Sequence, residues 1–201
     1  MIFGIVFSAT FLDAQNYEQT LKQCLKNFHE GLGQFTKEKA AAEIERRYNV
    51  LSQCIQGQKF PAFNLTTYNG SKYSSQENIN KVVLLNFWIT KSPTSVAAIP
   101  MLNELTDEYK DKDFVILSFS ADGFTALTNF LKEHLVKYRV FEKSRELINH
   151  QFNTLLGYPT HIFLNKKGEV VEYKVGGGLK PEELKKEKEE FKRIIEEELA
   201  K

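Results

Sequence analysis

The chain has 201 residues, of which 42% are hydrophobic and 26% charged, and its formal net charge is +1. This is enough for one domain with a sizeable core plus an appendage, and the composition is that of an ordinary globular protein. The balanced charge gives no indication of nucleic acid or an anionic membrane surface as a partner.

The first twelve residues are uncharged and mostly apolar, and Asp13-Ala14-Gln15 follows them. This run is too short to span a membrane as a helix, so we expect no stable membrane span in the mature chain. We interpret residues 1–14 as a signal peptide cleaved after Ala14. No basic residue precedes the run, and Leu12 stands where signals prefer a small side chain. The alternative is a buried N-terminal segment.

Residues 15–56 are predicted to form a helical hairpin that precedes the main domain. Apolar side chains recur every three or four residues in two stretches, which is the spacing of two amphipathic helices. Gly31 and Gly33 divide the stretches, which consist of Tyr17, Leu21, Cys24, Leu25, Phe28 and Leu32, and then Ala41, Ile44, Tyr48, Leu51 and Ile55.

The chain has two cysteines, Cys24 and Cys54, both in this hairpin. In an oxidising compartment two cysteines often pair. If the chain bends at Gly33, they lie about 14 and 31 Å from the bend at ~1.5 Å per helical residue. A disulfide needs Cα atoms within ~7 Å. A simple antiparallel hairpin therefore predicts two unpaired cysteines.

The main domain is predicted over residues 57–201. It opens with a β-hairpin in which residues 63–68 alternate as a strand and Asn69-Gly70 makes the turn. Residues 82–88, VVLLNFW, then form a near-continuous apolar run, typical of a strand covered on both faces. A turn and a helix containing Pro100 follow, and Pro100 is expected to kink that helix.

Further elements alternate along the rest of the domain. We expect strands over residues 114–120, 138–140, 161–164 and 169–175, and helices over 124–134, from Ser144 to about Phe152, and from Pro181 onwards. This order predicts an α/β fold with a mixed central sheet and helices on both faces.

The central stretch carries a family pattern, F-W-x-T-x-C-x-x-C-x-x-x-[MI]-P. It is matched by Phe87, Trp88, Thr90, Pro93, Ile99 and Pro100. The chain therefore resembles the TlpA-like or redoxin group of thiol–disulfide oxidoreductases over residues 57–178. The resemblance implies a thioredoxin fold with an N-terminal β-hairpin, preceded here by the helical hairpin.

The two cysteine positions of the pattern are occupied by Ser92 and Ser95. Disulfide exchange needs a thiolate at a helix N-terminus and a second thiol to resolve the mixed disulfide. A serine hydroxyl does not ionise near neutral pH and forms no disulfide. We therefore expect this turn to be redox-inactive, which leaves open whether the protein is an enzyme.

A second family feature is a cis-proline facing the motif, and Pro159 in Gly-Tyr-Pro-Thr resembles it. In the family, the backbone of the preceding residue, here Tyr158, pairs with an extended substrate peptide. The predicted peptide-binding set is thus Trp88, Lys91, Pro93, Tyr158 and Pro159. The resemblance implies unfolded or extended protein segments in the cell envelope as partners, a periplasmic or secreted location, and no cofactor or metal.

Three alternatives remain open at this point. Ser92 could be a nucleophile with His161 as its base, although helix capping explains Ser92 more simply. The serines could be engineered replacements in an active oxidoreductase. Cys24 or Cys54 could serve as the working thiol. Asn86, which stands where thioredoxins place a buried carboxylate, cannot transfer protons as that carboxylate does.

Overall fold

The computed structural model describes residues 3–30, 37–142, 144–148, 152 and 156–201; of residues 3–13 and 37–41 it describes only the backbone. A helical hairpin comes first, α1 (Phe3–His29) and α2 (Lys37–Ile55). The main domain consists of β1 (Asn64–Thr66), β2 (Lys72–Ser74), the short helix η1 (Ser75–Asn78), β3 (Val82–Trp88), α3 (Pro93–Glu108), β4 (Phe114–Ser120), α4 (Phe124–Glu133), β5 (Arg139–Phe141), β6 (Thr160–Leu164), β7 (Val170–Val175) and α5 (Pro181–Leu199). Of the predicted helix from Ser144 to about Phe152, residues 145–148 are helical and the Ile148 N–H donates to the Ser144 carbonyl at 2.8 Å, whereas residues 149–151 lie outside the described residues.

The five-stranded sheet has the order β5-β4-β3-β6-β7. Strand β3 pairs in parallel with β4 and antiparallel with β6, so the sheet is mixed as predicted. All seven residues of β3 are buried. The apolar run of this strand follows from that position, because helices or loops cover both of its faces.

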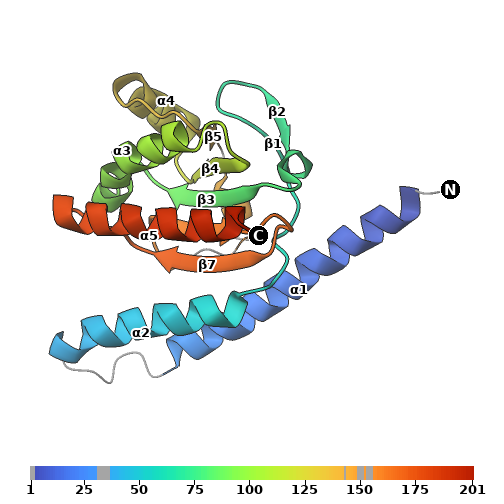
Figure 1. Cartoon of the computed structure of the whole chain (residues 1–201), viewed down its shortest axis with the longest axis horizontal. Helices are drawn as coiled ribbons and strands as arrows, with labels where there is room; N and C mark the ends of the chain where they lie inside the picture. Colours follow the sequence, from blue (N-terminus) through green and yellow to red (C-terminus); the bar gives the residue numbers. More distant parts are fainter. Residues whose placement is uncertain (1–2, 31–36, 143, 149–151, 153–155) are drawn as a thin grey trace.

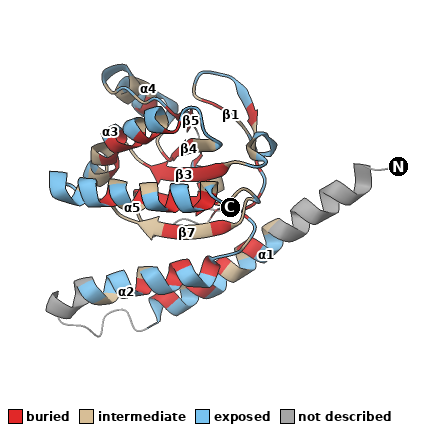
Figure 2. Cartoon of the chain, viewed as in Figure 1, coloured by how far each residue is buried: buried red, intermediate tan, exposed pale blue. Residues whose placement is uncertain are grey.

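The two faces of the sheet bury different elements (Figure 1). On one face, Leu84, Ile116 and Phe163 pack against α3 and α5. On the other face, Val83 and Leu85 belong to the largest apolar cluster, which includes Phe60, Phe63 and side chains of α1 and α2. The helical hairpin is therefore part of the folded core and packs mainly along β7. Figure 2 shows buried residues where α1 and α2 face each other and the sheet.

Helix α1 is one continuous helix from Phe3 to His29, and its N-terminal part extends away from the rest of the molecule (Figure 1). It joins the apolar N-terminal run to the predicted first helix of the hairpin, and the signal peptide stays a prediction. Over the described residues, no helix has both the length and the apolar content that crossing a membrane requires.

The prediction that Cys24 and Cys54 stay unpaired is wrong. They form a disulfide with an S–S distance of 2.07 Å and a Cα–Cα distance of 5.9 Å. Distances counted from one bend at Gly33 do not apply, because α1 and α2 are displaced along their axes relative to each other.

Arg47 shows the size of this displacement. Its guanidinium donates hydrogen bonds to the carbonyls of Phe28 and Glu30 at the C-terminal end of α1. The first ten residues of α2, about 15 Å of helix, therefore lie beyond the end of α1. From Arg47 to Cys54 is then about 10 Å, and from His29 back to Cys24 about 7 Å, so the two cysteines meet.

Candidate functional site

The turn between β3 and α3 is organised by Ser92. This residue is the N-cap of α3, and its hydroxyl accepts a hydrogen bond from the Ser95 N–H at 3.3 Å. Pro93 follows at the first helical position, where its missing N–H leaves no hydrogen bond unmade. Lys91 and Pro93 are exposed. The capping role predicted for Ser92 is confirmed.

The loop around Pro159 faces this turn directly. The Tyr158–Pro159 peptide bond is cis, as predicted. The Ser92 hydroxyl donates to the Tyr158 carbonyl at 3.1 Å, and the Thr94 hydroxyl donates to the same carbonyl at 3.4 Å. Ser92 thus bridges the helix start and the residue before the proline.

Three predicted site residues lie inside the protein: Trp88, Ser95 and Pro159. Trp88 is 1% exposed and packs edge-on against Phe130 with ring centroids 5.4 Å apart. Ser95 is also buried, and its hydroxyl has no hydrogen-bond partner among the described residues. The accessible part of the predicted peptide-binding set is therefore Lys91, Pro93 and the Tyr158 backbone. Trp88, buried at the end of β3, packs inside the protein next to the turn.

Asp122 is a site residue that sequence reasoning missed. Its carboxylate accepts hydrogen bonds from the Thr90 N–H at 2.7 Å, the Thr90 hydroxyl at 3.1 Å and the Ser120 hydroxyl at 3.0 Å. It thereby fixes the start of the turn. A signal was present, because Asp122 closely follows β4, and neighbouring parallel strands end at the same edge of a sheet.

Two charged groups lie near the Tyr158 phenol, Arg145 and Asp122. The Arg145 guanidinium donates to the Ala121 carbonyl at 3.0 and 3.1 Å. Burial raises the pKa of the Tyr158 phenol, while the Arg145 charge lowers it and the Asp122 charge raises it. The phenol is thus a neutral group at neutral pH, near one cation and one carboxylate. Phe124, at the start of α4, is 51% exposed and packs against Tyr68.

His161 is not a base for Ser92. It lies on the α5 face of the sheet, with its ring 5.0 Å from that of Phe191 and its Nε2 3.9 Å from a Glu187 carboxylate oxygen. Burial lowers the pKa of His161 to about 3, so the ring is neutral. Both ring nitrogens lack a hydrogen-bond partner among the described residues. The Ser–His hydrolase hypothesis therefore finds no support in this geometry.

The layer beneath the turn contains polar side chains and the carboxyl group of Glu187. Asn86 lies opposite His161 across β3 and β6 and donates to the Ser118 hydroxyl at 3.1 Å. Burial raises the pKa of Glu187, which accepts a hydrogen bond from the Gly178 N–H at 3.2 Å. No group of three or more metal-ligating side chains was found in the described part of the chain.

The sheet order, the turn at the N-terminus of α3 and the facing cis-proline define a thioredoxin-like protein. The chain matches the Redoxin family over residues 55–190 and belongs to that family. The matched residues contain the Ser92 turn and Pro159, but neither Cys24 nor Cys54.

Curated relatives are similar over most of their length. The chain is 30% identical over 141 residues to a thiol-disulfide oxidoreductase ResA of Bacillus thuringiensis subsp. konkukian, covering 69% of this chain and 78% of the relative. It is 33% identical over 137 residues to the thioredoxin-like protein YneN of Bacillus subtilis, covering 63% and 75%.

Solved structures show the same fold. A thiol:disulfide interchange protein of the thioredoxin family from Chlorobium tepidum superposes with a TM-score of 0.60 at 24% identity, covering 70% of this chain and 95% of that one. The exposed lipoprotein thioredoxin Etrx1 of Streptococcus pneumoniae gives 0.52 at 24% identity, covering 64% and 98%. The predicted thioredoxin fold is confirmed.

Proposed function

We propose that this redoxin-family protein binds extended protein segments at the Ser92–Tyr158 groove and exchanges no disulfide there. The observation that carries the proposal is the position of the Ser92 hydroxyl. It caps α3 and donates to the Tyr158 carbonyl, at the place where exchange chemistry needs a thiolate. A hydroxyl in this place provides a hydrogen bond and no redox chemistry.

The Tyr158 backbone supports the binding half of the proposal. Its N–H makes no hydrogen bond to any described residue, whereas its carbonyl already accepts from the Ser92 and Thr94 hydroxyls. An extended peptide can therefore accept a main-chain hydrogen bond from the Tyr158 N–H. Exposed Lys91 and Pro93 lie on the turn that Ser92 joins to Tyr158, and they add one cation and apolar surface there.

An extracytoplasmic location fits this proposal. The Cys24–Cys54 disulfide is of the kind that persists in oxidising compartments. One of the proteins with the same fold is described as an exposed lipoprotein. The partners would then be unfolded or extended protein segments in the bacterial envelope.

The redox half is tested by insulin reduction with a dithiol reductant. We expect no catalysis above background for the chain as it is, and a clear gain for Ser92→Cys/Ser95→Cys, because the helix start and the facing loop are in place. Ser74→Cys/Ser71→Cys, in the β1–β2 hairpin, is the matched control with two added thiols. Catalysis by the unaltered chain that survives Cys24→Ala/Cys54→Ala would contradict the proposal.

The binding half needs a direct measurement. Reduced, carboxymethylated α-lactalbumin serves as the unfolded probe, titrated into isotope-labelled protein and followed by amide NMR. We expect saturable shifts of the Tyr158 and Thr94 amides, with the Lys132 amide on α4 unchanged. Shifts confined to other surfaces would show that the groove is not the binding site.

A second candidate function is thiol–disulfide exchange at the Cys24–Cys54 disulfide. It rests on the different exposure of the two cysteines. Cys24 is 2% exposed, whereas Cys54 is exposed to solvent, so an external thiol can reach one sulfur only. This is the arrangement in which an exposed cysteine forms a mixed disulfide and a buried one resolves it. Insulin reduction by the unaltered chain that is lost in Cys54→Ser would favour this candidate over a purely structural disulfide.

A further inference from the structure

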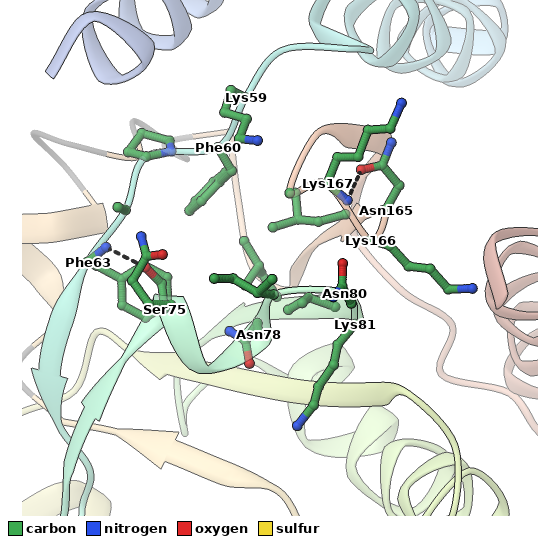
Figure 3. A pocket seen from close by; sticks show the side chains of 18 residues that line it. Lys59, Phe60, Phe63, Ser75, Asn78, Asn80, Lys81, Asn165, Lys166 and Lys167 are labelled. Atoms are coloured by element: carbon green, nitrogen blue, oxygen red, sulfur yellow. Dashed lines mark hydrogen bonds between the residues drawn. The ribbon is translucent and has the colours of Figure 1, made fainter. Parts of the chain in front are cut away.

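A cavity of about 420 Å³ lies at the opposite edge of the sheet from Ser92, beside the start of β3. Three segments wall it: residues 59–63 before β1, residues 75–81 around η1, and the β6–β7 turn at 165–168 (Figure 3). The cavity is separate from the Ser92–Tyr158 groove, because neither Ser92 nor Tyr158 lines it and its last lining residue in β3, Leu85, lies about 10 Å before the end of that strand. Its volume is within the range of small-molecule sites.

Hydrogen bonds between the walls hold this cavity open in the folded protein. Phe63 and Ser75 are joined twice, through Ser75 N–H to the Phe63 carbonyl at 2.9 Å and Phe63 N–H to the Ser75 hydroxyl at 3.0 Å. The Phe60 N–H donates to the Gly168 carbonyl at 2.9 Å, and the Asn80 N–H donates to another carbonyl of the same turn at 3.2 Å. A ligand would enter a preformed site and would not have to order these segments.

The inner surface of the cavity is apolar. Phe60 and Phe63 line one side, and Val83, Leu85 and Leu164 from β3 and β6 form the floor; all five are buried. Ile79 extends this surface to the mouth, where it is 64% exposed. An exposed isoleucine on the lip of an apolar cavity is surface that a ligand's hydrocarbon can cover.

The rim of the cavity is cationic. Lys59, Lys81, Lys166 and Lys167 line it, and no acidic side chain of the described residues does. Lys166 donates to the Leu199 carbonyl, but the other three ammonium groups have no recorded partner in the described part of the chain. This is a local excess of positive charge in a chain whose net charge is only +1. Figure 3 shows the four lysines around the cavity, with Lys81 and Lys166 directed away from its centre and Phe63 on one wall.

We propose that this cavity binds an anionic amphiphile, an aliphatic carboxylate whose chain lies on the apolar floor and whose carboxylate reaches the lysine rim. The apolar floor excludes a small inorganic anion as the best ligand, because most of the cavity would gain nothing from it. The unpaired lysines disfavour a cationic amphiphile, since like charges repel. The inference is independent of peptide binding at Tyr158.

Dodecanoate, kept below its micelle concentration, is the probe, and calorimetric titration is the measurement. We expect saturable one-to-one binding that weakens with added salt. Dodecanol should bind at least tenfold more weakly, and dodecyltrimethylammonium should not bind. Equal binding of dodecanol and dodecanoate would overturn the role given to the lysines, and no binding of dodecanoate would overturn the proposal as a whole.

Paired variants locate the site. Lys59→Gln/Lys167→Gln should weaken dodecanoate binding at least tenfold, whereas Lys132→Gln/Lys185→Gln, on α4 and α5, should leave it unchanged. Ile79→Glu places a negative charge in the mouth and should abolish binding, while Ile44→Glu on α2 should not. All of these side chains are exposed, so folding is preserved. Equal effects of the cavity and control variants would refute the site.

A short peptide with a free C-terminal carboxylate and apolar last residues provides the remaining comparison. If it displaces dodecanoate and binds more tightly, with the same dependence on Lys59 and Ile79, the ligand class is a protein terminus and the proposed class is wrong. If neither the acid form nor the C-terminal amide form of the peptide displaces dodecanoate, the result supports an aliphatic carboxylate as the ligand class.

Discussion

Thiol–disulfide exchange needs a thiol at a helix N-terminus. In this chain the helix N-terminus at Ser92 and the two cysteines of the helical hairpin lie in different regions. The turn has the helix start, the facing proline loop and an oriented backbone, but no sulfur. The hairpin has both cysteines of the chain, joined in a disulfide outside the part that matches the family. The thioredoxin-like geometry and the disulfide therefore lie in different parts of this chain.

The variant with the largest expected effect on stability removes both cysteines. In the chain-entropy view, a disulfide that closes a 30-residue loop stabilises the folded protein by about 3–4 kcal/mol. Because α1 and α2 contribute to the main core, Cys24→Ala/Cys54→Ala should lower the free energy of unfolding by this amount in urea. Gln53→Ala, exposed on α2, is the control. If the variant showed one unfolding transition at low urea and a second at the midpoint of the unaltered protein, the hairpin would fold independently of the main domain.

How far the sequence predicted these two regions follows from the kind of signal each one carries. The buried strand, the turn and Pro159 were predicted because apolar periodicity and a family pattern cover residues 82–100 and 157–160. The disulfide was not, because the axial displacement of two helices depends on tertiary contacts such as Arg47 with the end of α1. Asp122 was missed as a site residue because its role depends on which strands are neighbours.

The second test asks whether the polar layer beneath the turn does proton chemistry or only packs. His161 has a pKa of about 3 in the folded protein, lowered by burial, against about 6.5 when unfolded. As pH falls below 6.5 the unfolded chain gains a proton that the folded chain does not, so stability decreases. Between pH 7 and pH 5 this loss should be about 2 kcal/mol.

His161→Met, which keeps the buried volume, should remove this part of the pH dependence. The neighbouring Glu187, whose pKa is raised by burial, acts in the opposite direction in both proteins, so the difference between them isolates the histidine. Denaturant titrations at pH 7 and pH 5 supply the measurement, with His134→Gln on α4 as the control. Parallel pH profiles of the unaltered chain and His161→Met would show that the ring is protonated in the folded state.

A third test weakens the support of the turn without touching either serine. Asp122→Asn replaces one carboxylate oxygen with an NH₂ group, which cannot accept the bond from Thr90. Because hydrogen bonds to charged groups contribute more than neutral ones, we expect a loss of about 1.5 kcal/mol in unfolding free energy. Binding of carboxymethylated α-lactalbumin should weaken as well, whereas Asp111→Asn, in the α3–β4 connection, should change neither. Unchanged stability would mean that Asp122 does not hold the turn.

The smallest expected effect on stability is the difference between the single variants Ser92→Ala and Ser95→Ala. Ser92→Ala removes the cap of α3 and the bond to the Tyr158 carbonyl, and should cost about 1 kcal/mol in unfolding free energy. Ser95→Ala removes a buried hydroxyl that has no partner among the described residues, so it should be neutral or slightly stabilising.

Of the two serine hydroxyls, only that of Ser92 has a hydrogen-bond partner among the described residues. Thermal unfolding of the two single variants, measured side by side, resolves the order. If Ser95→Ala were the more destabilising, the buried hydroxyl would have a partner inside the protein. The turn would then be built around its second serine, and the groove proposed at Tyr158 would lose its main structural support.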